Sequence, residues 1–155
     1  MPVKNEIAKV SMRGTVDDTG ALNTYVEKTI DTNLSFNGQH AFIVTGILFR
    51  HDGVLNGNRN VDITLAYETQ NAAPQPSDPS FIFGASWASA QLTSGSVAYN
   101  NAQYQDIDHF PIAVQSIFLG LKTANMGAAT TAHVKLYGYH MKISQADFFR
   151  LAQSR

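Results

Sequence analysis

The stretch VDITLAYE at positions 61–68 alternates apolar side chains with polar or small ones, and this alternation indicates the fold class. Val61, Ile63, Leu65 and Tyr67 fall on one face of an extended chain, and their neighbours fall on the other. A period of two residues is that of a β-strand with one face toward a core and one toward water. The stretch 61–68 therefore predicts a strand, and a strand needs partner strands elsewhere in the chain.

Two longer runs, 41–49 and 110–121, are apolar on both faces. Such runs are typical of strands buried in the middle of a sheet. A weaker alternation predicts a strand over 22–30. Other apolar or β-branched segments predict strands over 8–15, 81–87, 96–99 and 132–143. The chain is expected to form about eight strands.

Turn signals separate these strands. Residues 17–20 end in Gly20, and Asn56-Gly57 is suited to a tight hairpin. Residues 70–79 hold three of the five prolines, so they are predicted to form a long surface loop or crossover.

One helix is predicted, and it is the last element. Ser144 and Asp147 have the spacing of a capping box, with Asp in place of Glu. Phe148, Leu151 and Ala152 follow at the i, i+3, i+4 spacing that places side chains on one helix face. A helix this short must dock on another element to be stable.

Residues 1–155 are expected to form a single domain, with 1–7 as an N-terminal extension and 144–155 as a C-terminal helix and tail. Each half of the chain holds about four strands, too few for a closed core of its own. Loops of unequal length favour an all-β fold, an antiparallel β-sandwich of jelly-roll type. An immunoglobulin-like sandwich is the rival, but Trp87 has no cysteine pair around it.

The composition excludes several classes of protein. Lys and Arg number 11 and Asp and Glu number 12, so the net charge is −1, and charged residues make up only 15% of the chain. Direct nucleic-acid binding is not expected, because phosphate contacts need clustered Lys and Arg. The chain has no cysteine, which excludes disulfide scaffolds and thiolate metal sites. No apolar run approaches the roughly 18 residues of a membrane span, and no signal-peptide core or cofactor motif is present.

The motif Asp18-Thr19-Gly20 is the signature of retroviral-type aspartic proteases, and the stretch 117–120 superficially supplies their late apolar-apolar-Gly segment. In those enzymes an apolar strand leads directly into the aspartate, whereas here Asp17 precedes it. A second carboxylate would disturb a shared-proton pair. The motif is interpreted as a turn, an aspartic protease is the less favoured reading, and no enzymatic activity is expected.

The sequence offers candidates for a cation site, for histidine metal ligands and for an acid–base pair, and none of them is the favoured interpretation. Oxygen ligands alternate in Asn56–Asp62, but the loop has one carboxylate and contains an arginine, so an Asn-rich hairpin tip is preferred to a cation site. Among the five histidines (His40, His51, His109, His133 and His140), the last two are seven residues apart and are expected on opposite faces of one strand. Asp106–His109 resembles a carboxylate–imidazole pair, but it is expected in a loop that leads into a strand.

A carbohydrate- or receptor-binding module, such as a spike or lectin-like domain, is the alternative function. Exposed aromatic rings stack on sugars, and Asn or Gln side chains hydrogen-bond to their hydroxyls. Trp87, Tyr99 and Tyr104 lie in an Asn- and Gln-rich part of the chain and are the candidate glycan contacts. A core tryptophan followed by a polar loop explains the same pattern.

The shortage of charge favours contacts between copies, because fewer charges are desolvated when two such surfaces meet. Phe148 and Phe149 are adjacent in the predicted helix, so only one of them can point fully into its own sheet. Together with Leu151 they are the candidate interface residues.

Eight strands, an N-terminal extension, the Pro-rich segment 70–79 and the lack of an active-site motif together resemble the single jelly-roll capsid proteins of icosahedral, tailless phages or viruses, membrane-containing ones included. The segment 110–114, followed by 132–139, is similar to the closing strands of such proteins. The resemblance implies a structural virion protein, a capsid or capsid-decoration subunit that self-assembles in the host cytoplasm. Its implied partners are copies of itself and other capsid proteins. The weak charge of the N-terminus implies a genome behind a membrane or another layer.

Overall fold

The computed structural model describes residues 9–20, 23–34, 40–55, 58–89, 101–126 and 128–153. Within these ranges the chain forms eight strands followed by one helix. In chain order they are β1 (Lys9–Asp17), β2 (Asn23–Asp31), β3 (His40–His51), β4 (Arg59–Ala66), β5 (Phe81–Ser89), β6 (Ala102–Ile112), β7 (Ser116–Ala124), β8 (Thr131–Lys142) and α1 (Gln145–Gln153). The expected all-β fold with a short C-terminal helix is confirmed.

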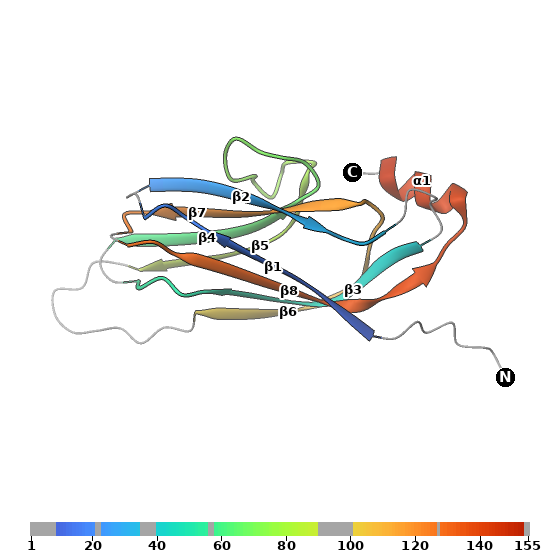
Figure 1. Cartoon of the computed structure of the whole chain (residues 1–155), viewed down its shortest axis with the longest axis horizontal. Coiled ribbons are helices and arrows are strands. Elements are labelled where there is room, and N and C mark those ends of the chain that lie inside the picture. Colours follow the sequence, from blue (N-terminus) through green and yellow to red (C-terminus); the bar gives the residue numbers. More distant parts are fainter. Residues whose placement is uncertain are drawn as a thin grey trace.

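The strands form two four-stranded antiparallel sheets (Figure 1). The first sheet has the order β1-β8-β3-β6 and the second has the order β2-β7-β4-β5. Strand β1 pairs with β8, β2 with β7, β3 with β6 and β4 with β5. This is the pairing of one long antiparallel ribbon wrapped into a sandwich, which is the jelly roll that the sequence predicted.

The core lies between the two sheets and follows the alternation along each strand. Val61, Ile63 and Leu65 of β4 are fully buried, as the pattern of 61–68 predicts. Strand β3 contributes Phe42 and Phe49 from the opposite sheet. Burying side chains of this size stabilises the fold by about 1.5–3 kcal/mol each.

The predicted strand over 110–121 is wrong in its extent. Strand β6 ends at Ile112 and β7 begins at Ser116, so the apolar run contains the connection between two strands. Ala113 and Val114, which follow β6, are themselves buried, so the apolar pattern continues past the end of that strand. The polar pair Gln115-Ser116 interrupts the run where β7 begins, and both residues are partly buried.

The expectation of a loop over Asp106–His109 is also wrong, because β6 spans these residues. The β3–β6 register is irregular, since Val44 pairs with Phe110 whereas Gly46 pairs with Asp106. His109 has a positive φ of 48° in this irregular segment. A bulge disrupts the two-residue period and hides a strand from periodicity. The predicted strand over 96–99 lies outside the described residues.

The edge strands β5 and β6 are joined across the open side of the sandwich by glutamine side chains. The Nε2 of Gln105 donates to the carbonyl of Gly84 at 3.1 Å, and that of Gln103 donates to the carbonyl of Ser86 at 3.1 Å. Unpaired carbonyls on an edge strand otherwise invite pairing with another chain. The side-chain amides cover part of the β5 edge instead.

Candidate functional site

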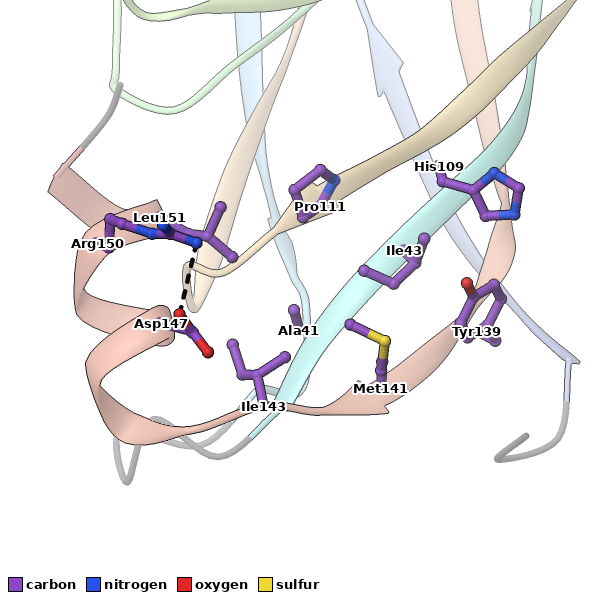
Figure 2. Close-up of a pocket in the computed structure, with 10 residues that line it drawn as sticks. All are labelled: Ala41, Ile43, His109, Pro111, Tyr139, Met141, Ile143, Asp147, Arg150 and Leu151. Carbon is purple, nitrogen blue, oxygen red and sulfur yellow. Dashed lines mark ion pairs between the residues drawn. The ribbon is translucent and has the colours of Figure 1, made fainter. Parts of the chain in front are cut away.

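An apolar groove lies between α1 and the outer face of the first sheet (Figure 2). Its volume is about 330 Å³. Strands β3, β6 and β8 form its floor, and α1 forms one wall. The residues that line it are Ala41, Ile43, His109, Pro111, Tyr139, Met141, Ile143, Asp147, Arg150 and Leu151.

The start of α1 is capped as the sequence predicts. The backbone N–H of Asp147 donates to Ser144 Oγ at 3.1 Å, and Ser144 Oγ donates to the Asp147 carboxylate at 2.7 Å. Arg150 lies 3.4 Å from the other oxygen of that carboxylate. These polar contacts fix the start of α1 beside the groove. Because exposed ion pairs add little stability, the helix must be held against the sheet by apolar packing.

Leu151 and Ile143 attach α1 to the sheet. They pack against a small second cluster formed by Ala41, Ile43 and Ala113. Among the candidate interface residues, Leu151 therefore contacts its own chain, where it lines the groove. Phe149 is 49% exposed. The Phe148 side chain lies outside the described part of the structure.

Asp18, the aspartate of the protease-like motif, is a buried structural carboxylate. The N–H groups of Gly20 and Thr130 donate to its Oδ1 at 2.9 and 2.8 Å. The hydroxyls of Thr123 and Thr24 donate to its Oδ2 at 3.0 and 3.3 Å. The carboxylate thus ties the end of β1 to β2, to β7 and to the segment before β8, and both of its oxygens are used within the chain.

The candidate glycan contacts Trp87 and Tyr104 differ in burial in the structure. Trp87 is 7% exposed and packs edge-on against His51, with ring centroids 4.7 Å apart. The inclusion of Trp87 among the glycan contacts was wrong, because its ring fills the core between the sheets. Tyr104 lies on the outer face of the first sheet and is 57% exposed. Tyr99 lies outside the described residues.

The five histidines are dispersed over the first sheet. His133 contacts Thr15 on the outer face, whereas His140 points inward and meets Phe42 edge-on. They therefore face opposite sides of β8, as their spacing predicts. Among the described residues, no three His, Asp or Glu side chains gather closely enough to hold a metal ion.

The segment Asn56–Asp62 is described only from Asn58 onward. Arg59 donates to the carbonyl of Val54 at 2.9 Å, and the Asn58 carbonyl accepts from Asn125 at 2.8 Å. Asp62 lies within β4 and faces away from the core. Arg59 and the Asn58 carbonyl are therefore engaged in hydrogen bonds within the chain.

On the outer face of the second sheet, Glu27 joins β2 to the Pro-rich loop. Its Oε2 accepts from the Tyr25 hydroxyl and from the backbone N–H of Gln70, both at 3.0 Å. Burial and the adjacent Glu27 carboxylate raise the pKa of Tyr25. This contact fixes part of the loop, which rises beside β2 in Figure 1.

Sequence reasoning missed Gly46, Tyr137 and Tyr139 on the outer face of the first sheet. The tyrosine rings belong to β8, and Gly46 of β3 pairs with Tyr137. The alternation Tyr137-Gly138-Tyr139 is a signal for two aromatic rings on one face, but it does not reveal which face is outside.

The described part of the chain contains no helix with the length and apolar character needed to cross a membrane.

None of the protein-family models compared with the chain matches it, and neither does any curated protein sequence. A delta-endotoxin of Bacillus thuringiensis is similar in structure over 84% of this chain and 20% of its own, with 9% identity and a TM-score of 0.31. An infectious bursal disease virus structure is similar over 88% of this chain and 36% of its own, with 14% identity and a TM-score of 0.28. The chain spans about a fifth and about a third of the lengths of these two proteins.

Proposed function

We propose that this chain is a structural virion protein, a single jelly-roll capsid or capsid-decoration subunit that acts through self-assembly. The observation that carries the proposal is the wrapped pairing of eight strands into the sheets β1-β8-β3-β6 and β2-β7-β4-β5. The partners in this proposal are copies of the chain and other capsid proteins, and its place is the virion after assembly in the host cytoplasm. A membrane near the shell is compatible with it.

The apolar groove beside α1 supports this proposal as a surface for contacts between copies. Phe149 and Met141, 49% and 38% exposed, lie on the helix and at the end of β8 beside it. Large apolar side chains exposed near an apolar groove are typical of interfaces. The net charge of −1 gives little repulsion between copies.

The contacts of Asp18 support a non-enzymatic role. A shared-proton aspartyl pair needs a carboxylate that faces its counterpart across a cleft. Here four donors of the same chain hold the Asp18 carboxylate, which is 6% exposed. The Asp-Thr-Gly motif is explained as a turn.

Light scattering and negative-stain electron microscopy of the purified chain test this proposal. The expected result is a set of closed shells, pentamers or hexamers whose proportion rises with protein concentration. A monomer at every concentration, with or without other capsid proteins of the same virus, contradicts the proposal. A stable monomer that binds a glycan array instead supports a carbohydrate- or receptor-binding module.

A further inference from the structure

The Tyr104 ring lies on the outer face of the first sheet and packs against the neighbouring strand β3. Its hydroxyl end lies against Gly46 of β3, and a Cβ atom at position 46 would collide with the phenol. The ring therefore lies over the neighbouring strand instead of extending freely into water. Its 57% exposure leaves much of the ring available to a ligand.

Tyr137 of β8 provides a second aromatic ring next to Tyr104. The Tyr104 and Tyr137 rings are 6.1 Å apart between centroids, and their planes are inclined by 65°. Thr45 donates its hydroxyl to the Tyr137 carbonyl at 3.3 Å, on the strand between the two tyrosines. An inclined pair of rings on a hydrogen-bonded sheet is preorganised, so less side-chain entropy is lost on binding.

Groups of both charges border the two rings. Lys135 places its Nζ 4.7 Å from the centroid of Tyr137. Asp106 follows Tyr104 on the same face of β6, and partial burial together with the nearby Asp106 carboxylate raises the pKa of the Tyr104 hydroxyl. The surface thus combines an apolar ring face with a hydrogen-bond acceptor and a cationic donor.

We propose that Tyr104, Tyr137, Asp106 and Lys135 form a carbohydrate-binding site whose ligand is a neutral hexopyranose at the end of a glycan. A pyranose has an apolar C–H face that stacks on an aromatic ring, and its equatorial hydroxyls need both acceptors and donors at the rim. A nucleic-acid strand fits this surface less well, because Asp106 and the exposed Asp108 on β6 repel phosphates. The site does not depend on the proposed assembly, and either can fail without the other.

The test uses the full chain and a panel of neutral gluco-, galacto- and manno-oligosaccharides, with saturation-transfer NMR and titration as readouts. At least one neutral glycan is expected to bind with a dissociation constant below about 10 mM. Tyr104→Ala is expected to weaken that binding by about tenfold or more. Tyr104→Phe is expected to retain most of the binding, because the ring face remains.

Gly46→Ala displaces the Tyr104 ring without removing it, and it is expected to weaken binding as well. Tyr25→Phe, on the opposite sheet, is the matched control and is expected to leave binding unchanged. Circular dichroism establishes that each variant is folded. The proposal is overturned if no neutral glycan binds, if Tyr104→Ala binds as tightly as the unmodified chain, or if the surface binds only acidic sugars or single-stranded nucleic acid.

Discussion

Asp18 and His51 are both buried polar side chains that depend on hydrogen bonds within the chain. The Asp18 side chain accepts from four donors. His51 is fully buried beside Trp87, and its Nδ1 accepts a hydrogen bond from the Gly53 N–H at 3.1 Å. A ring nitrogen that accepts cannot carry a proton, so the folded chain requires this imidazole to be neutral.

We expect Asp18→Ala to lower the free energy of unfolding by about 3 kcal/mol or more. The substitution leaves the backbone N–H groups of Gly20 and Thr130 without their acceptor, and each buried unsatisfied donor costs about 1–3 kcal/mol. Urea unfolding measures the change. Asp17→Ala is the control, because Asp17 is exposed and its hydrogen bond to Thr131 is at the surface, so a loss of about 1 kcal/mol or less is expected there. Equal losses for the two variants would contradict the structural role of Asp18.

Stability is expected to fall as the pH drops below about 6.5. Burial lowers the pKa of His51 and of His140 below their ordinary value of 6.5. Above pH 6.5 both imidazoles are neutral in the folded and unfolded chains, and below it the unfolded chain takes up protons first. Chemical unfolding at a series of pH values measures the slope. His51→Gln should flatten the dependence of the unfolding free energy on pH. His133→Gln, on the outer face, is the control and should retain the dependence of the unmodified chain. If His51→Gln also retains it, this assignment is refuted.

Two elements, β6 and α1, show how tertiary context decides local structure. Strand β6 is interrupted by a bulge at His109, and its Gln103 and Gln105 side chains donate hydrogen bonds to β5. The apolar part of α1 contacts the outside of the first sheet through Leu151, not the main core. Each element is stable because of a neighbour that is distant in the sequence.

The double variant Gln103→Ala/Gln105→Ala is expected to lower the free energy of unfolding by about 1–3 kcal/mol, since each hydrogen bond contributes about 0.5–1.5 kcal/mol. It should also increase aggregation, because the carbonyls of Gly84 and Ser86 on the β5 edge become available to other chains. Thermal unfolding and turbidity measure the two effects. Gln75→Ala, in the exposed Pro-rich loop, should change neither, and a double variant that behaves like Gln75→Ala would show that the edge is not protected in this way.

Over the molecule as a whole, the exposed large apolar side chains are unevenly distributed. Phe149, Met141 and the groove lie at one end of the sandwich, beside α1, whereas Val54, 63% exposed, follows the end of β3. An assembly that covers α1 and the groove would remove the apolar surface at that end from water.

Phe149→Ser is therefore expected to raise the concentration needed for self-assembly by about tenfold or more, as loss of an apolar anchor typically does. Sedimentation velocity over a range of concentrations measures it. Val54→Ser removes an exposed apolar side chain elsewhere and should leave assembly unchanged. If both variants assemble like the unmodified chain, α1 is not part of the contact.

Much of the architecture could be predicted from local patterns. The alternation at 61–68 identifies β4, and the Ser144–Asp147 spacing identifies the start of α1. The end of β6 could not be predicted, because Ala113 and Val114 beyond it are as buried as Ile112 within it, and only Gln115-Ser116 marks the start of β7. The aromatic surface could not be predicted either, since Gly46, Tyr104 and Tyr137 come from three distant segments.

Local patterns in the amino-acid sequence establish an all-β chain with about eight strands and a capped terminal helix, because periodicity, turns and caps depend on near neighbours. The burial of Trp87 in the core, the exposure of Tyr104 and the four hydrogen bonds to Asp18 follow from the folded arrangement. Burial and hydrogen-bond partners depend on which strands meet. Except for β4 and β5, the paired strands of this jelly roll are far apart in the sequence, so their pairing is set by the wrapping of the whole chain and not by any local pattern.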